Sequence, residues 1–339
     1  MIKYSCCRIA VLLITLCSCA LAHAETTNVD PDFKAFIAGI EAELQSKGID
    51  PSLFRRAFGP DMSPDRRAVT QMKNQPESKF TFAKYSASMV SPNRVATGRT
   101  QLAENRQTLN RISAKYGVPA GVIVALWGVE SFYGKWPGKH HIVRSLATLA
   151  YDSHRQAFFR KELMAAMQIL QEGHIAPEHM TGSWAGAMGQ CQFMPSSFMA
   201  YAADGDGDGH KNIWEVDADV FASTANYLKK QGWKPGQAWG QRVVLGKFLP
   251  ADLRFSERGL SHPMPLEKWQ KEGVIAAHGG FKVPASTKAR LFIPDGPSGK
   301  AYLVYPNFDV ILDWNRSSYF AWSVLTLADA VAADKVAAQ

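Results

Sequence analysis

An apolar run from Val118 to Val129 constrains the fold of this chain more than any other stretch. Apolar residues would cover all sides of a helix drawn through it, so we expect a buried helix, and Pro119 suits its first turn. Glu130 follows directly and is the only charged residue within 116–134. Burial raises the pKa of a carboxyl, and a carboxyl that is protonated near neutral pH can serve as a general acid. The structural alternative, in which Glu130 pairs with a buried cation or caps a turn, stays open.

The amino-terminal residues have the pattern of a secretory signal peptide. Two basic residues precede an apolar run from Ile9 to Leu21, and Ala22-His23-Ala24 matches a cleavage site before Glu25. The run is shorter than the roughly 20 residues that span a bilayer. We therefore expect residues 1–24 to be removed and the mature protein to be exported to the periplasm. The alternative is an outer-membrane lipoprotein that is anchored through Cys19.

The charge and the cysteine content narrow the class of partner. The formal net charge of +8 falls to +6 when the signal peptide is removed with Lys3, Arg8 and no acid. This modest positive balance favours an anionic polymer or surface, and the sequence has no dense Lys/Arg stripe or reader motif that would indicate nucleic acid. Only Cys191 of the five cysteines follows residue 24, so we expect no internal disulfide. We expect a monomer.

Hydrophobic periodicity predicts an α+β protein that is mostly helical. Helices are expected over residues 32–47, 51–58, 92–115, 118–129, 142–150, 158–170, 221–230 and 320–336, with a loop over 59–79. After Gly232, short runs rich in Val, Ile, Leu and Tyr predict strands over 242–245, 290–293, 302–305 and 310–312. A turn at 295–299 would join two of these strands, so this part of the chain is expected to form a small β subdomain.

Residues 204–215 match the calcium-loop pattern D-x-[DN]-x-[DN]-G-x5-E at every position. Oxygen atoms at alternate positions can surround a hard cation, and Gly209 permits the sharp turn. The expected ligands are Asp204, Asp206, Asp208, the carbonyl of His210, and Glu215. We expect structural Ca²⁺, or Na⁺, because three carboxylates this close in sequence repel one another without a cation. A solvated acidic turn is the alternative.

Two polar segments are candidates for ligand binding. Residues 183–198 are rich in small side chains, which let a backbone approach a ligand closely, and Gln190 and Gln192 offer amide donors and acceptors there. A tight helix crossing would use the same small residues, and this alternative stays open. Residues 151–155 form the second polar segment, which can present Arg155 to a cleft.

Taken together, these stretches resemble the lytic murein transglycosylases of the MltB type (membrane-bound lytic transglycosylase B family). The resemblance rests on residues 128–134 (Gly-Val-Glu-Ser-Phe-Tyr-Gly), 183–189 (Ser-Trp-Ala-Gly-Ala-Met-Gly), 192–197 (Gln-Phe-Met-Pro-Ser-Ser), the calcium loop, and Asn315-Arg316-Ser317. These motifs occur in the order and spacing of that family and cover most of the mature chain.

The resemblance implies a fold and a set of site residues. It implies a helical region over 25–115, a lysozyme-like catalytic core over 116–232, a small β subdomain over 233–314, and a C-terminal helix over 315–339 that packs back on the core. It also implies Glu130 as the only catalytic carboxyl. By motif position, the residues that would line the sugar subsites are Ser183, Gln192, Tyr85, Arg155, Asn315 and Tyr319.

Two positions depart from the family pattern. The family often has Tyr where this chain has Phe320, and the nearest tyrosine here is one residue earlier, at Tyr319. The last metal-loop carboxylate of the family aligns better with Asp219 than with Glu215. Which of these two acids closes the cation shell therefore stays open.

The resemblance also implies a reaction. The family cleaves the β-1,4 bond between N-acetylmuramic acid and N-acetylglucosamine in peptidoglycan glycan strands without water, and forms a 1,6-anhydromuramyl end. One carboxyl suffices, first as acid and then as base, and the chemistry needs no cofactor. Two alternatives stay open: a hydrolytic muramidase, and a peptidoglycan-binding protein without activity. Proteins of a wall-synthesis complex are candidate partners in addition to the glycan.

Overall fold

A computed structural model describes residues 30–73, 80–246, 253–256, 259–296 and 299–333. The expected signal peptide, residues 1–24, lies outside the described residues, and so does the part of the last expected helix beyond residue 333.

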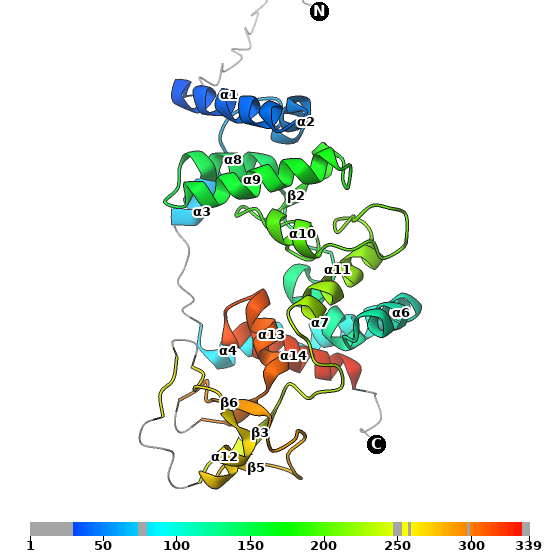
Figure 1. Cartoon of the computed structure of the whole chain (residues 1–339), viewed down its shortest axis with the longest axis vertical. Coiled ribbons are helices and arrows are strands. Elements are labelled where there is room, and N and C mark those ends of the chain that lie inside the picture. The colour runs from blue at the N-terminus through cyan, green and yellow to red at the C-terminus, as the bar shows by residue number, and fades with distance from the viewer. Residues whose placement is uncertain (1–29, 74–79, 247–252, 257–258, 297–298, 334–339) are drawn as a thin grey trace, which may run out of the picture.

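The chain is mostly helical and carries a small antiparallel sheet in its C-terminal third. The helical elements are α1 (Pro31–Ser46), α2 (Pro51–Phe58), α3 (Arg66–Lys73), α4 (Phe82–Met89), α5 (Pro92–Glu104), α6 (Arg106–Tyr116), α7 (Ala120–Ser131), α8 (Ile142–Tyr151), α9 (Gln156–Gln171), the 3-10 turn η1 (Pro177–His179), α10 (Pro195–Tyr201), α11 (Asp217–Lys230), α12 (Leu266–Lys271), α13 (Pro306–Trp314) and α14 (Ser318–Ala332). The strands are β1 (His140–His141), β2 (Thr181–Gly182), β3 (Gly240–Val244), β4 (Met264–Pro265), β5 (Ile275–Ala276), β6 (Lys288–Phe292) and β7 (Ala301–Val304). Figure 1 shows α1, α2, α8 and α9 at one end of the molecule, the sheet at the other, and α7, α11, α13 and α14 between them.

Helix α7 is buried on nearly every side, as its sequence predicts. All residues from Gly121 to Gly128 are buried, and α5, α6, α11 and α14 pack around them. After the helix ends, Phe132 and Tyr133 adopt left-handed backbone conformations with φ angles of 51° and 58°. The chain therefore turns sharply just after Glu130, which lies in the last turn of the helix.

Within the described residues, no single helix is both long and apolar enough to cross a membrane. Helices α6 and α7 reach the required length and composition only as a pair, and this pair is bent by 110°.

The five-stranded sheet has the order β4-β6-β7-β3-β5 and a core of its own. Trp269 of α12 and Leu291 of β6 are fully buried in that core. The strands expected at 242–245, 290–293 and 302–305 are confirmed as β3, β6 and β7, with ends that differ by one or two residues.

The strand expected at 310–312 is wrong, because these residues lie in helix α13 and are buried in the main core. A run of three apolar residues does not distinguish a strand from one face of a helix. Pro306 stands in the first turn of α13, a position that favours a helix. The C-terminal third of the chain therefore returns from the sheet to the helical core before Trp314.

Two further expectations differ from the structure. The single helix expected over 92–115 is interrupted at Asn105, whose side-chain amide donates to the Gln101 carbonyl. Asn competes for backbone hydrogen bonds in this way and favours helix ends. The loop expected over 59–79 contains α3, which Asp65 caps by accepting two backbone N–H groups of its first turn. Only Ala68 of α3 is buried, and only Ala68, Val69 and Met72 of its eight residues are apolar, which is too few to indicate a helix from the sequence.

A buried carboxylate fixes α10 against α9. Glu162 of α9 is 2% exposed, and its two oxygens accept the backbone N–H and the hydroxyl of Ser196 at 2.8 and 2.7 Å. Ser196 lies in the first turn of α10, where backbone N–H groups lack helical partners. Glu162 therefore holds the segment that leads from Gln192 into α10.

We predict that Glu162→Ala lowers the free energy of unfolding by about 2–3 kcal/mol, because it leaves two partly buried donors of Ser196 without a charged acceptor. Urea denaturation followed by circular dichroism measures this change. Glu104→Ala, on the exposed surface of α5, is the control and should change the free energy by less than about 0.5 kcal/mol. Equal effects of the two variants would contradict a capping role for Glu162.

Candidate active site

Glu130 lies in the last turn of α7, beside the indole of Trp314 at the end of α13. The indole N–H of Trp314 donates to Glu130 Oε1 at 2.6 Å. Burial raises the pKa of Glu130 to about 7, and the bond from Trp314 opposes this rise. In the described part of the chain, no charged group pairs with Glu130 or perturbs its pKa. The carboxyl can therefore both give and take a proton near neutral pH.

The contact with Trp314 also selects one oxygen of the carboxyl. An indole N–H donates a hydrogen bond and accepts none, and the carbonyl oxygen of a protonated carboxyl is a better acceptor than its hydroxyl oxygen. The bond from Trp314 to Oε1 therefore favours the proton on Oε2 when Glu130 is protonated. Sequence reasoning missed Trp314, because no pattern relates two side chains that are 184 residues apart.

The glycines of the 128–134 motif make room for the turn that follows Glu130. A Cβ at Gly128 would lie 2.5 Å from the ring of Tyr133, and one at Gly134 would overlap Gln190 Oε1. The Tyr133 hydroxyl donates to a backbone carbonyl of α5 at 2.7 Å. Close packing therefore requires both glycines, and the turn is tied to α5 and to Gln190.

Gln190 and Gln192, which the sequence groups together, have different environments. Gln190 is buried: its Oε1 accepts the Trp127 indole N–H at 2.6 Å, and its Nε2 donates to the Trp214 carbonyl at 3.0 Å. It therefore joins α7 to the end of the expected calcium loop. Gln192 is partly exposed, and its Nε2 donates to the Pro137 carbonyl at 2.7 Å. The Oε1 of Gln192 has no partner among the described residues and is free to accept a bond from a ligand.

Tyr85 of α4 and Tyr319 of α14 come together, with ring centroids 6.2 Å apart. Burial and the negative charge of Glu130 both raise the pKa of Tyr85, so Tyr85 lies within electrostatic reach of Glu130. Tyr319 is partly exposed, whereas Phe320 is buried. The tyrosine that stands one position early is therefore the one that a ligand can contact.

Ser183, Asn315 and Arg155 lie on three further segments. Ser183 directly follows β2, and its Oγ accepts a backbone N–H four residues later at 3.0 Å. Asn315 directly follows Trp314 and is exposed. Arg155 is exposed and packs its guanidinium over the ring of Phe158, 4.1 Å from the centroid. No contact within the described residues brings Arg155 to the other candidates.

Trp136 is a second aromatic residue that the motif analysis did not single out. It is 70% exposed, and its ring stacks on that of Phe132 at a centroid distance of 4.9 Å and an angle of 23°. This exposed indole lies six residues after Glu130, so the segment that leaves the acid carries an aromatic surface.

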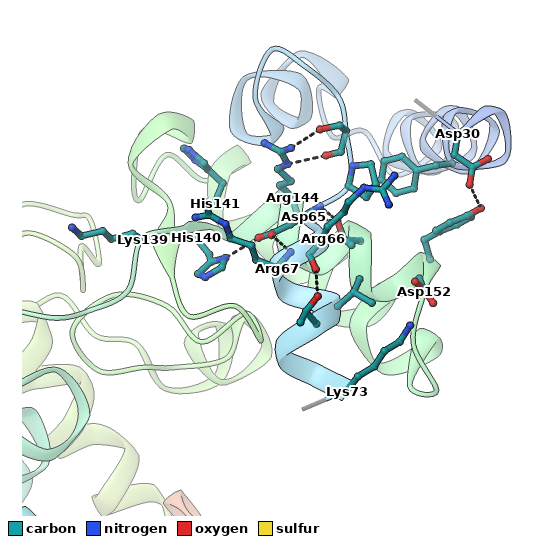
Figure 2. Close-up of a pocket in the computed structure, with 17 residues that line it drawn as sticks. Asp30, Asp65, Arg66, Arg67, Lys73, Lys139, His140, His141, Arg144 and Asp152 are labelled. Carbon is teal, nitrogen blue, oxygen red and sulfur yellow. Dashed lines mark hydrogen bonds and ion pairs between the residues drawn. The ribbon is translucent and has the colours of Figure 1, made fainter. Parts of the chain in front are cut away.

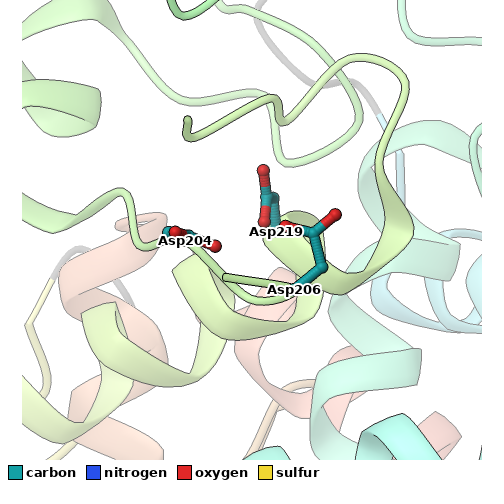
Figure 3. A group of neighbouring side chains, drawn as sticks. All are labelled: Asp204, Asp206 and Asp219. Atoms are coloured by element: carbon teal, nitrogen blue, oxygen red, sulfur yellow. The ribbon is translucent and has the colours of Figure 1, made fainter. Parts of the chain in front are cut away.

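Three carboxylates converge where residues 204–215, the expected calcium loop and from here the cation loop, meet α11 (Figure 3). Oxygen atoms of Asp204, Asp206 and Asp219 lie within 4.8 Å of one another. Asp219 is buried, and its two oxygens accept the backbone N–H groups of Gly205 and Asn212 at 2.7 and 2.6 Å. Such a cluster of hard oxygen ligands suits a cation such as Ca²⁺.

The carboxylates of Asp208 and Glu215 lie outside this cluster. Glu215 pairs with His179 at 3.0 Å, and Asp208 accepts the backbone N–H of His210 at 2.7 Å. The loop pattern in the sequence counts positions along one turn, whereas helix α11 brings Asp219 back to the start of the loop. The geometry therefore groups Asp219, and not Glu215, with the first two aspartates.

The end of the cation loop supports the site around Glu130. The backbone N–H of Gln190 donates to the Ile213 carbonyl at 2.9 Å, and a Cβ at Gly189 would lie 2.6 Å from the same carbonyl. At the start of the loop, Arg111 of α6 donates to the Gly205 carbonyl at 2.6 Å. The loop is thus fixed to α6 at one end and to the Gln190 segment at the other.

One partly exposed acid with a raised pKa, in a mostly helical core with an attached sheet, is the arrangement expected of lysozyme-like transglycosylases. The comparison with known families agrees with this class. The family model described as Transglycosylase SLT domain matches residues 32–329. The chain therefore belongs to this family of lytic transglycosylases, which are enzymes that act on peptidoglycan.

Individual relatives support the same family. Membrane-bound lytic murein transglycosylase B of Escherichia coli (strain K12) is 32% identical over 282 residues, which cover 80% of this chain and 73% of that protein. SltB3 from Pseudomonas aeruginosa, solved in complex with NAG-anhNAM-pentapeptide, is 40% identical with a TM-score of 0.84, over 88% of this chain and 79% of that one. Slt35 from Escherichia coli, solved in complex with calcium, is 28% identical with a TM-score of 0.72, over 89% and 93% of the two chains. The expected fold class is confirmed.

We predict that Trp314→Phe moves the alkaline limb of the pH–activity profile to higher pH by about one unit. The bond from Trp314 favours the ionised carboxylate, so its loss raises the pKa of Glu130 further. The protonated acid then persists to higher pH. The measurement is kcat/KM from about pH 5 to 9, whose limbs report the ionisations of the free enzyme.

Trp322→Phe is the matched control for this substitution. The Trp322 indole N–H is buried and has no hydrogen-bond partner among the described residues, so the control removes the same atoms without removing a bond. It should leave the position of the limb unchanged, whatever its effect on the rate. An alkaline limb that stays in place or moves to lower pH in Trp314→Phe would contradict the role of Trp314.

Proposed function

We propose that Glu130 is the sole catalytic carboxyl and that it cleaves peptidoglycan without water, first as acid and then as base. The observation that carries this proposal is the place of Glu130 in the last turn of α7, where the Trp314 indole N–H donates to its carboxyl and burial raises its pKa to about 7. Hydrolytic glycosidases place a second carboxylate about 5 to 9.5 Å from the acid. A carboxylate within about 4–6 Å of Glu130 would raise its pKa further, and among the described residues no carboxylate contributes to it.

The reaction runs in two proton transfers. Protonated Glu130 gives its proton to the oxygen that links N-acetylmuramic acid to N-acetylglucosamine, and the bond from this oxygen to the muramyl C1 breaks. The acetamido oxygen of the muramyl unit stabilises the positive charge at C1. The Glu130 carboxylate then removes the proton of the muramyl 6-hydroxyl, whose oxygen bonds to C1. The products are a 1,6-anhydromuramyl end and a free 4-hydroxyl, and Glu130 regains its proton.

The remaining candidate residues would position the sugars. We assign Ser183 and Gln192 to the acetamido group and ring next to the cleaved bond, since the hydroxyl can donate and Gln192 Oε1 can accept. Contacts to the neighbouring sugar rings are assigned to Tyr85, Tyr319, Asn315, Arg155 and Trp136. Correct orientation of reacting groups can lower a barrier by several kcal/mol. Because SltB3 was also solved with NAG-NAM-pentapeptide, we include peptide-bearing glycan in the proposed substrate.

We predict that the protein releases muropeptides one water lighter than hydrolysis products from purified peptidoglycan. Glu130→Gln keeps the shape of the side chain but has no proton to give, so its activity should fall by at least about 100-fold. Liquid chromatography with mass spectrometry identifies the products. Glu104→Gln on exposed α5 is the matched control and should keep full activity.

Each other result of this experiment identifies an alternative. Products that contain the extra water would identify a hydrolytic muramidase. Glycan binding with no product from the unaltered protein would identify a peptidoglycan-binding protein without activity. Undiminished product from Glu130→Gln would exclude Glu130 as the acid.

We also infer a structural cation site that consists of Asp204, Asp206 and Asp219, with Asp219 in the place that the loop pattern gives to Glu215. The three carboxylates supply the oxygen ligands that Ca²⁺ takes, and Na⁺ is the weaker alternative. The relative Slt35, which was solved in complex with calcium, supports this inference. The cation would hold the loop to α11 and take no part in the proton transfers.

We predict that Ca²⁺ raises the melting temperature by several degrees relative to excess chelator, because it binds the folded loop and not the unfolded chain. Asp206→Asn and Asp219→Asn should each abolish most of this increase, and Glu215→Gln should retain it. Differential scanning calorimetry of the four proteins measures the increase. An increase lost in Glu215→Gln but kept in Asp219→Asn would reverse the assignment, and a melt of the unaltered protein that ignores Ca²⁺ would exclude the site.

We propose that the protein acts in the periplasm as a monomer. The Escherichia coli relative is membrane-bound, and both readings of the amino-terminal residues, cleavage after Ala24 and lipidation at Cys19, export the chain to the compartment that contains peptidoglycan.

A further inference from the structure

A pocket of about 980 Å³ lies between α1, α3, β1 and α8 (Figure 2). Ligand pockets commonly have volumes of about 300–1,000 Å³, so this one has room for several amino-acid residues. Its walls come from the start of α1, from α3 and the loop before it, from Lys139 and strand β1, and from α8. Glu130, Ser183 and Gln192 do not line it, so the pocket is separate from the candidate sugar-binding residues.

The pocket has more basic than acidic side chains. Its lining contains five Lys or Arg residues and three acids, Asp30, Asp65 and Asp152. Asp65 is already engaged, because its Oδ2 bonds His140 at 2.7 Å and its Oδ1 caps α3. Arg144 is engaged as well, with an acid that does not line the pocket, at 3.0 Å.

Four basic side chains of the pocket are left without an ion pair among the described residues. They are Arg66, Arg67, Lys73 and Lys139. Arg66, Arg67 and Lys73 lie on the short helix α3, and Lys139 directly precedes β1 on the other side (Figure 2). These cations surround a concave site that also includes the apolar surfaces of Val69 and Tyr151. The four basic residues are exposed, but they share with Val69 and Tyr151 the lining of one open concave site and so differ from a flat solvated face.

Strand β1 connects this pocket to Ser183, one of the candidate sugar-binding residues. His140 and His141 of β1 pair with β2, and Ser183 directly follows β2. A Cβ at Gly138 would overlap the carbonyl of Gly182, so the two segments are in close contact just before the pocket. Nine positions along the chain separate Glu130 from Lys139. A ligand group that occupies the pocket can therefore belong to the same substrate whose sugar lies at Ser183.

We propose that this pocket binds the carboxylates of the peptide that the muramyl unit carries. The proposal rests on the proposed function, since it needs a peptidoglycan substrate. A peptide joined to the sugar through its amino end keeps a free C-terminal carboxylate, and each acidic residue adds another. Guanidinium groups match carboxylates in shape and charge, so Arg66 and Arg67 bind these carboxylates, and Val69 and Tyr151 contact the aliphatic parts of the peptide.

Binding to the full-length Glu130→Gln protein tests this proposal without turnover. Titration calorimetry compares NAG-NAM-pentapeptide with the same disaccharide without peptide. The peptide-bearing ligand should bind more tightly. Adding Arg66→Ala and Arg67→Ala should weaken its binding about tenfold, while binding of the bare disaccharide changes less than twofold. Higher ionic strength should reduce the advantage of the peptide-bearing ligand in the parent protein.

Lys268→Ala with Lys271→Ala on α12 is the matched control, because it removes the same charge from exposed positions outside the pocket. It should leave both affinities unchanged. A pentapeptide with a carboxamide in place of each carboxylate should lose its advantage over the bare disaccharide. Equal weakening of both ligands by the arginine substitutions, or no weakening, would overturn the proposal. Failure of the proposed function is a different result: the protein with Glu130 intact would form no anhydro product from any glycan.

Discussion

The proposed active site depends on a single carboxyl, Glu130, which protein atoms largely surround although the residue is partly exposed. Burial raises the pKa of Glu130 from 4.5 to about 7, and the bond from Trp314 limits the rise. Because the folded chain binds this proton more tightly than the unfolded chain, the resulting stabilisation is complete below about pH 4.5 and is lost as the pH rises through about 7. A pKa difference of this size corresponds to about 3 kcal/mol at most. Above about pH 7 the buried carboxyl is ionised, and its burial then lowers the free energy of unfolding. Glu130 therefore costs stability near the pH at which its pKa allows it to give and take a proton.

The surrounding structure offsets this cost by fixing the segments that meet at Glu130. Buried Gln190 contacts Trp127 of α7 and the Trp214 carbonyl at the end of the cation loop. Gly134 leaves space for Gln190, and Glu162 fixes α10 at the far end of the same segment. A change in the cation loop can therefore reach Glu130 through Gln190, although the proposed cation takes no part in the proposed proton transfers. Stability and positioning depend on the same few buried polar groups.

The sequence predicted those features that depend on local pattern. The apolar run before Glu130 indicated the buried helix, and β-branched residues indicated β3, β6 and β7. Helix α3 was missed because its apolar residues are few and its stability comes from the Asp65 cap and from packing on α8. The bond from Trp314 was missed because it joins residues from distant parts of the chain. The clustering of Asp219 with the loop aspartates needs helix α11 to turn back toward them, which a loop pattern does not describe.

The segment after α7 connects the acid directly to the basic pocket. It begins with the left-handed turn at Phe132 and Tyr133, is held at Pro137 by Gln192, and reaches the pocket at Lys139. In the proposed reaction, the bond that breaks belongs to the muramyl unit, which is also the sugar that carries the peptide. Carboxylates held by Arg66 and Arg67 would therefore fix the position of that sugar along the strand. Since N-acetylglucosamine carries no peptide, a strand displaced by one sugar would lose these contacts, and the pocket would favour the register in which Glu130 meets the muramyl bond.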